Sequence, residues 1–178
     1  MAHINLPDGL PGIIGPLTSY PETGKHLNGL TEALLRGPSS LTSAERELIA
    51  AYVSAQNECT FCVNAHAAVA RCLYGEDRDL VDQAITNFQQ ADLSDKMKAL
   101  LVIAGKVQQG GRRVTEEDVA SARAAGADDK AIHDTVLTAA AFCMFNRYVD
   151  GLATWTPEGA AAYDQAGAVL AEKGYLSL

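Results

Sequence analysis

Four residues in one short stretch have the types and the spacing to make, use and reset a disulfide. The pattern E-x11-C-x2-C-x3-H is formed by Glu47, Cys59, Cys62 and His66 within ERELIAAYVSAQNECTFCVNAH. Residues i, i+3 and i+4 share one face of a helix, so the two thiols and the histidine can converge there. The stretch therefore predicts a thiol site with a histidine beside it and a carboxylate supplied from an upstream apolar run.

The chemistry open to this set follows from the ordinary pKa values of its side chains. A free cysteine with a pKa of about 8.5 is mostly protonated at neutral pH, although the thiolate is the nucleophile. A histidine with a pKa of about 6.5 can accept the thiol proton or stabilise the thiolate, and a carboxylate can orient that histidine. A second thiol closes a disulfide on an oxidised sulfur before irreversible acids form. These properties favour a redox-active pair.

Two other interpretations of the C-x2-C pair stay open. A structural zinc site usually needs a second Cys/His pair about 12 to 20 residues further on. After Cys62 the sequence offers His66 and Cys72, then neither residue type until His133 and Cys143. A metal would therefore need the upstream carboxylate as a ligand. The pair could instead be two buried thiols with a structural role only. We expect no metal and no bound cofactor.

The motif and its surroundings resemble the alkylhydroperoxidase D-like branch of the carboxymuconolactone decarboxylase superfamily. The stretch 21–66 resembles the N-terminal half of the peroxidase-related members, and 114–153 resembles their C-terminal half. Together these stretches cover most of residues 11–155. The resemblance implies an all-α fold, reduction of small or organic hydroperoxides by a thiol cycle, an external dithiol as reductant, and a homo-oligomer.

The resemblance also implies roles for the motif residues. The second motif cysteine of the family attacks the peroxide and the first resolves it, so Cys62 would attack, Cys59 would resolve, and His66 and Glu47 would form the proton relay. Spacing alone leaves the attacking thiol open, because Cys59 lies nearer the expected helix start, where the helix dipole favours a thiolate. The best-studied branch has a further histidine where this chain has Phe61.

Two functions other than a peroxidase are compatible with the motif. The decarboxylase branch typically lacks the C-x2-C pair, which argues against a carboxymuconolactone decarboxylase-like lyase. A non-catalytic redox-sensing helical oligomer is the other alternative. We expect an alkylhydroperoxidase-like oxidoreductase that uses the thiol pair.

Length and charge set broader limits. The chain has 178 residues, of which 48% are hydrophobic and 20% charged, as expected for one globular domain. A net charge of −8 without a basic run argues against nucleic acid or anionic membrane as a partner. The N-terminal sequence lacks the features of a signal peptide, and no run approaches 18 apolar residues. Four cysteines in such a chain indicate a reducing compartment, and we expect the cytoplasm.

Helix signals divide the chain into a short arm and one helical bundle. Residues 1–20 contain three of the six prolines and are expected to form an irregular arm, whereas residues 21–178 form a single all-helical domain. No segment alternates apolar and polar residues as a strand would. Starts and stops of helices are predicted at Pro21, Gly37, Thr42 with Glu45, Asn57, Gly75, Ser94 or Asp95, Thr115 with Asp118, Asp128, Pro157 and Gly174.

A weak internal repeat is visible at an offset of 84 residues. AYVSAQNECTF at 51–61 overlays TVLTAAAFCMF at 135–145. The match favours two similar helical units packed pseudo-symmetrically, of which only the first keeps the thiols. The second unit has Asn146 in place of Cys62.

Further candidates lie on and beyond the long apolar helix expected at 128–150. His133 is a candidate site residue on that helix, with a core or interface position as the alternative. Asn146 is a polar break in the same helix and is a second candidate, with a hydrogen bond across an interface as the alternative. The helix itself is expected to be buried in the core or against another subunit. Cys72 is expected to be a buried inert thiol, and Trp155 a packing anchor.

Overall fold

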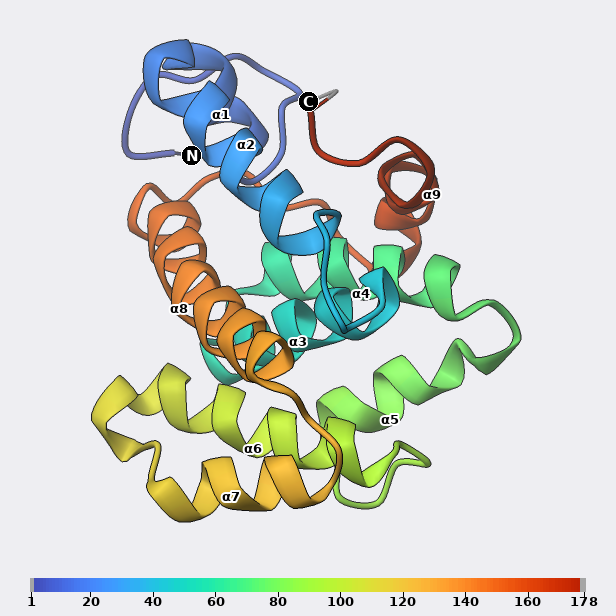
Figure 1. Cartoon of the computed structure of the whole chain (residues 1–178). Helices are drawn as coiled ribbons and strands as arrows, with labels where there is room; N and C mark the ends of the chain where they lie inside the picture. The colour runs from blue at the N-terminus through green and yellow to red at the C-terminus, as the bar shows by residue number, and fades with distance from the viewer. Residues whose placement is uncertain (1, 177–178) are drawn as a thin grey trace.

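Helices make up the whole architecture of residues 2–176, the part of the chain that the computed structural model describes (Figure 1). No strand occurs within this range, and the expected all-α fold is confirmed. The α-helices are α1 (Ile14–Ser19), α2 (Pro21–Leu35), α3 (Ser43–Gln56), α4 (Thr60–Tyr74), α5 (Asp79–Asn87), α6 (Asp95–Gln109), α7 (Glu116–Ala124), α8 (Asp129–Gly151) and α9 (Asp164–Lys173). Single 3-10 turns occur at Gly75–Asp77, Gly111–Arg113 and Ala160–Tyr163.

Helix α3 forms the centre of the core. It packs mainly against α4, α8 and α6, and every residue from Arg46 to Ser54 is buried. The sequence in this stretch is apolar on nearly all sides, as expected for a helix that is surrounded by other helices. The polar residues Arg46, Glu47 and Ser54 are buried in it as well, and Glu47 is the one carboxylate of this stretch. A buried carboxylate needs partners, and these partners form the candidate site.

Capping residues decide where most helices begin and end. The two predicted capping boxes, Thr42 with Glu45 and Thr115 with Asp118, are both present. Ser94 and Asp128 each accept a backbone N–H bond at a helix start, as predicted. These side chains satisfy N–H groups that the helix itself leaves unpaired. The predicted starts and stops at Pro21, Gly75 and Gly174 are also confirmed.

The structure differs from the sequence analysis at both ends of the chain. Residues 14–19 form helix α1 inside the arm expected to be irregular. Pro16 is compatible with the first turn of this helix, because N–H groups there have no acceptor within the helix. At the other end, α9 begins at Asp164 rather than at Pro157. Gly159, with a φ of +77°, interrupts the helix between these points.

The predicted internal repeat is not matched in local structure. Residues 51–61 cover the end of α3, a turn and the start of α4, whereas 135–145 lie within the single helix α8. The turn requires Glu58 to adopt a φ of +61°. The equivalent position in the second stretch is Phe142, which continues α8 without a break. The shared letters therefore reflect two apolar helical stretches with different boundaries.

Several segments from both ends of the chain lie over one end of the α3–α4 pair. Figure 1 shows α1 and α2 above these helices and α9 beside them. Helix α9 packs closely on α4, because Gly167 faces Ala68 so tightly that an added Cβ would lie 2.7 Å from the Ala68 Cβ. None of the helices in residues 2–176 has the length and hydrophobicity needed to cross a bilayer.

Candidate active site

The two thiols lie at the start of α4. Cys59 is the N-cap residue and Cys62 is the third residue of the helix, so Cys59 caps this helix where the sequence analysis expected Asn57 to do so. The turn that places them depends on the left-handed backbone of Glu58 and on the bond from the Cys59 N–H to the Ser54 carbonyl (3.1 Å). Free N–H groups and the helix dipole at this end favour a thiolate.

The two sulfurs differ in exposure and in proton affinity. Cys59 is completely buried, whereas Cys62 lines a cavity. A hydrogen bond to Cys62, together with burial, raises the pKa of the Cys59 thiol. Both effects favour the protonated form of Cys59.

His66 is fixed by a buried carboxylate and two aromatic rings. Its Nδ1 lies 2.7 Å from the Oε2 of Glu47, which is fully buried. An ionised carboxylate can only accept, so Nδ1 carries the proton of this bond and Nε2 is left as the basic nitrogen. The ring of Tyr175 stacks on the imidazole at 5.9 Å, and the edge of Phe142 meets it at 4.5 Å. The imidazole can thus change its protonation state without changing its position.

Arg36 and Tyr175 complete the surroundings of Glu47, and the sequence analysis missed both. The Glu47 Oε1 is 2.7 Å from an Arg36 nitrogen and accepts a 2.7 Å bond from the Tyr175 hydroxyl. Burial alone would raise the pKa of Glu47, but His66, then Arg36 and Tyr175 together lower it. Glu47 is therefore ionised at neutral pH. No local pattern points to Arg36 at the end of α2 or to Tyr175 after α9.

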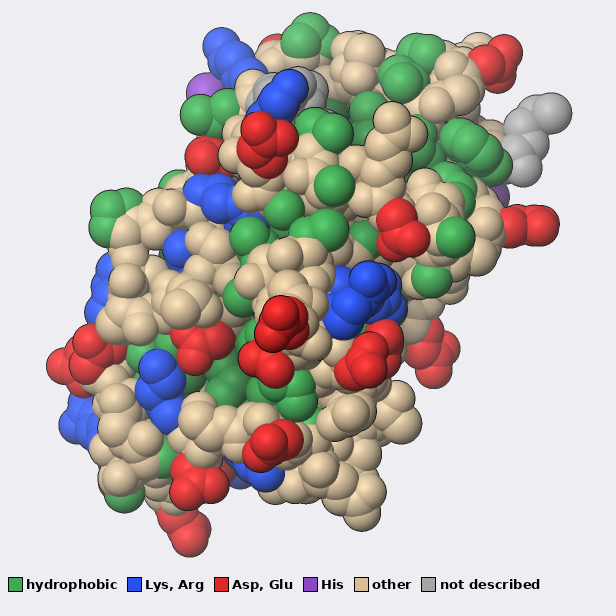
Figure 2. All heavy atoms as spheres, turned by 90° about the vertical axis from the view of Figure 1, so that its right-hand side faces the viewer, with side chains coloured by type: hydrophobic (Ala, Val, Ile, Leu, Met, Phe, Trp, Pro, Cys, Tyr) green, Lys and Arg blue, Asp and Glu red, His purple; other side chains and the backbone are tan. Residues whose placement is uncertain are grey.

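A largely apolar cavity of about 440 Å³ opens directly on Cys62 and His66. The same cavity is bordered by α1, α2, α8, α9 and the segment after α9, which places Tyr175 in its wall. Figure 2 views the face that carries α9, and hydrophobic side chains gather in its upper part. Most of the lining is apolar: Ile13, Ile14, Leu17, Leu27, Phe61, Ala65, Phe142, Phe145, Ala162, Ala166, Val169 and Leu170. The other lining residues are Asn28, Thr31, Cys62, His66, Gln165 and Tyr175.

Phe61 occupies the position at which the resembled branch carries a second histidine. Its ring lines the cavity and packs on Tyr163 at 5.8 Å. The N-terminal arm presses against the same ring, since a Cβ added to Gly12 would lie 2.2 Å from it. Phe61 thus contributes an apolar wall and no titratable group.

The structure places His133 and Asn146 away from this cavity. His133 is 64% exposed at the side chain and bonds to the neighbouring Asp134 (3.0 Å). Asn146 is fully buried, where it donates to the Ser54 hydroxyl (3.0 Å) and accepts from Asn57 (2.8 Å). Neither residue borders the cavity, and Asn146 instead links α8 to α3.

Other sequence expectations need correction or receive no support. Cys72 is exposed rather than buried, because it lies on the outer face of α4. Trp155 is also largely exposed. Helix α8 leaves Leu137 and Met144 uncovered on one face. Within residues 2–176, no three His, Cys, Asp or Glu side chains are grouped so that they could ligate a metal ion.

Comparison with known proteins finds a family match over part of the chain and similar solved structures. Residues 21–101, which contain the whole Glu-Cys-Cys-His motif, match the model of the carboxymuconolactone decarboxylase family. No curated protein sequence matches the chain significantly. An uncharacterized peroxidase-related protein from Ralstonia eutropha, described as an alkylhydroperoxidase AhpD core, is 28% identical with a TM-score of 0.78, over 89% of this chain and 82% of that one.

Two further solved structures are similar. An uncharacterized peroxidase-related protein from a Silicibacter species is 28% identical over 92% of this chain and 94% of its own, with a TM-score of 0.78. A protein of unknown function from Agrobacterium tumefaciens, whose description suggests an antioxidant defence protein AhpD, shares the fold at 20% identity and a TM-score of 0.68, over 83% and 99%. Over residues 21–101 the chain therefore matches the carboxymuconolactone decarboxylase family, and it has the alkylhydroperoxidase D-like fold of the peroxidase-related proteins that it resembles.

Proposed function

We propose that this protein is a thiol-dependent peroxidase that reduces organic hydroperoxides through a Cys59–Cys62 disulfide cycle. The observation that carries the proposal is the asymmetry of the two thiols. Cys62 borders the cavity together with His66, while Cys59 is fully buried, and burial with the hydrogen bond to Cys62 raises the pKa of the Cys59 thiol. A substrate in the cavity therefore meets one sulfur, and the second sulfur waits within bonding reach of the first.

The proposed cycle uses Cys62, Cys59, His66 and one external dithiol. The Cys62 thiolate attacks the terminal peroxide oxygen and the O–O bond breaks. The leaving alkoxide takes a proton delivered through His66, and Cys62 becomes a sulfenic acid. Cys59 then condenses with it, which forms the disulfide and releases water. An external dithiol reduces this disulfide and is itself oxidised to a disulfide.

Glu47 and His66 supply the acid–base step of this cycle. The carboxylate holds Nδ1 protonated, so Nε2 is the nitrogen that can exchange a proton with the thiol or with the alkoxide. Arg36 keeps Glu47 ionised at a distance of 2.7 Å. The relay thus returns to its starting state after each turnover.

The cavity favours organic over inorganic peroxide. Its volume is typical of small-molecule sites, and the apolar side chains that line most of it would be solvated poorly by hydrogen peroxide alone. An alkyl or aryl group would cover them and place its hydroperoxide against Cys62. Substrate consumption should therefore be faster for cumene hydroperoxide than for hydrogen peroxide.

The test is dithiol-dependent loss of cumene hydroperoxide by three proteins. Wild type should consume it with dithiothreitol, and Cys62→Ser should lose at least about 10²-fold in rate, because no other thiol borders the cavity in the described part of the chain. Cys143→Ser is the matched control, since Cys143 is a half-buried thiol outside the cavity. Equal rates for wild type and Cys62→Ser would contradict the peroxidase proposal.

We also propose a homo-oligomer in a reducing compartment such as the cytoplasm. Leu137 and Met144 lie two helical turns apart on one uncovered face of α8, which is suited to contact with another subunit. All four cysteines are free thiols, as a reducing compartment would keep them. Light scattering at micromolar concentration should give a mass of a dimer or larger, and a mass of 18.8 kDa would exclude assembly under these conditions.

A further inference from the structure

The first residues after α9 are buried: Gly174 and Tyr175 pack into the core, whereas Leu176 is exposed. Helix α9 ends at Gly174, whose φ of +71° lets the backbone turn back. The Tyr175 N–H donates to Glu32 at 2.6 Å, and an added Cβ on Gly174 would lie 2.5 Å from the same carboxylate. Glycine and the acceptor on α2 together clamp the segment 174–176 at this point.

Tyr175 contacts Glu47, His66 and Arg36, the charged and titratable groups next to the thiol pair. Its hydroxyl donates to the Oε1 of Glu47 (2.7 Å) and lies 3.2 Å from the Nδ1 of His66. Its ring is nearly parallel to the imidazole, and the Arg36 guanidinium lies 5.2 Å from the ring centroid on which it packs. One side chain therefore touches the acid, the base and the counter-charge of the relay.

The raised pKa of Tyr175 makes its hydroxyl a hydrogen-bond donor to Glu47. Burial, then the charge of Glu47 and its hydrogen bond, raise the pKa of the Tyr175 phenol well above its ordinary value. The hydroxyl keeps its proton wherever Glu47 is ionised. Because Glu47 then has one oxygen bonded to His66 and the other held by Tyr175 and Arg36, the carboxylate cannot rotate without losing a bond.

We propose that Tyr175 is a positioning residue of the thiol site, and that the segment 174–176 is part of the active site. The inference rests on the proposed function, because it assigns Tyr175 to the relay that activates Cys62. The hydroxyl fixes the Glu47 carboxylate, and the ring fixes the plane of His66. Together they hold the free imidazole nitrogen in one orientation toward the cavity.

The experiment measures how fast Cys62 is alkylated by iodoacetamide as a function of pH, with Cys72 and Cys143 replaced by serine. Tyr175→Phe keeps the stacked ring and removes only the hydroxyl. Its alkylation near pH 7 should be about fivefold slower than wild type, the size of one net hydrogen bond, and the two curves should meet at high pH, where the thiol ionises unaided. Tyr52→Phe is the matched control, since Tyr52 is a buried tyrosine outside the cavity.

Glu32→Ala provides a second variant that leaves the tyrosine intact. Loss of the clamp on the Tyr175 N–H should slow alkylation in the same pH-dependent way, and adding Tyr175→Phe to it should have less than the full additional effect. Thermal unfolding by circular dichroism confirms that each variant is folded. Curves for Tyr175→Phe that superimpose on wild type, or that lie below it equally at all pH values, would overturn the assignment.

The same assay separates this inference from the proposed function. Alkylation does not involve peroxide, so the Tyr175 effect can be seen even if wild type fails to consume any hydroperoxide. That failure would refute the peroxidase and leave the positioning of His66 standing. A peroxidase whose Tyr175→Phe variant matches wild type in both assays would refute the positioning role alone.

Discussion

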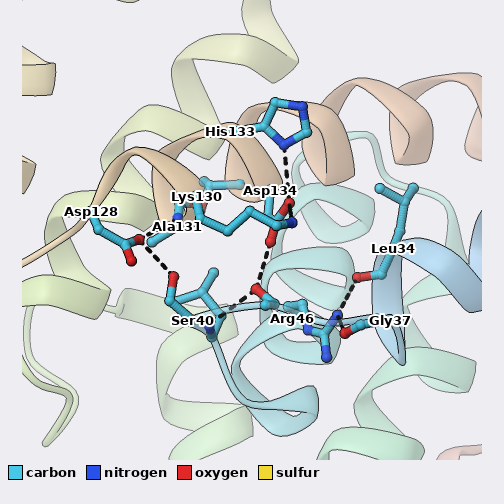
Figure 3. A network of polar contacts seen from close by, with 12 residues as sticks. Leu34, Gly37, Ser40, Arg46, Asp128, Lys130, Ala131, His133 and Asp134 are labelled. Carbon is cyan, nitrogen blue, oxygen red and sulfur yellow. Dashed lines mark hydrogen bonds and ion pairs between the residues drawn. The ribbon is translucent and has the colours of Figure 1, made fainter.

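Two regions of this protein contain a buried carboxylate bonded to a histidine, and they differ in everything around that bond. In the first, Glu47 on α3 holds His66 at 2.7 Å beside Cys62 and the cavity. In the second, Asp134 on α8 bonds to His133 at 3.0 Å near the loop that joins α2 to α3 (Figure 3). Both pairs lie on helices, and of the two histidines only His66 follows a cysteine by one helical turn.

The partners of the two carboxylates explain the difference. Glu47 is held by Arg36, whose side chain is 13% exposed, and by a buried tyrosine. Asp134 is held by Lys130, which is 51% exposed, and by the Ser39 hydroxyl (2.5 Å). Figure 3 shows how this second set joins the start of α8 to the turn before α3, with the His133 ring at the outer edge.

The exposure of the histidine separates a reactive arrangement from a structural one. The His66 side chain is 13% exposed and packed between two aromatic rings, whereas that of His133 is 64% exposed. The His133 ring is mostly in contact with solvent and does not border the cavity. A histidine–carboxylate pair is thus informative about function only together with a thiol and a cavity. The Asp134 set stabilises a loop.

The largest difference between the regions is expected in stability. Glu47→Gln leaves the Arg36 charge buried without its counter-charge, and should lower the free energy of unfolding by about 3 kcal/mol. Asp134→Asn frees a lysine that water can solvate, so its loss should be about 1 kcal/mol. Urea unfolding followed by circular dichroism measures both. Equal losses would show that the two carboxylates have equivalent surroundings.

The second difference is expected in thiol reactivity. His66→Ala should slow the reaction of Cys62 with peroxide at least about tenfold at neutral pH, since general acid–base contributions are typically 10²–10⁴-fold. Part of the rate should return at high pH, where the thiol ionises unaided. His133→Ala should leave the rate unchanged, because the His133 ring is exposed and does not border the cavity. The two histidines would not differ in function if His133→Ala slowed the reaction of Cys62 with peroxide, or if His66→Ala reacted at the wild-type rate at every pH.

The smallest difference is expected in the acid range. The pKa of Glu47 is lowered in the folded protein despite its burial, because His66, Arg36 and Tyr175 outweigh desolvation. A depressed carboxyl pKa contributes stability that is fully present above the unfolded value of about 4.3 and is lost as pH falls through the folded value. The gap in unfolding free energy between wild type and Glu47→Gln should therefore be constant from pH 7 to about 5 and shrink below about 4.

The gap in unfolding free energy between wild type and Asp134→Asn should change with pH in the same direction as the Glu47 gap, but by less. Burial raises the pKa of Asp134, but the bonds from Lys130, Ser39 and His133 together lower it. The gap between wild type and Asp134→Asn should also shrink in acid, over a smaller range of free energy. Chemical unfolding at pH 7, 5 and 3 gives both gaps. A gap that widens as pH falls would contradict the assigned direction for either carboxylate.

Much of the fold could be predicted because the decisive signals are local. A capping box needs only Thr42 and a glutamate three residues later, and the same holds for Thr115. The errors arose where backbone conformation broke a local pattern. Glu58 and Gly159 adopt positive φ values, and these residues end the apparent repeat and delay α9.

The sequence by itself determined the motif and the helices that carry it, since residues three and four apart are neighbours on any helix. Only the tertiary structure decided what surrounds the motif. Arg36 and Tyr175 come from the end of α2 and from beyond α9, and Tyr175 is 128 residues from the carboxylate that it contacts. A carboxylate buried in an apolar core must have partners, but which residues become those partners depends on how distant helices pack.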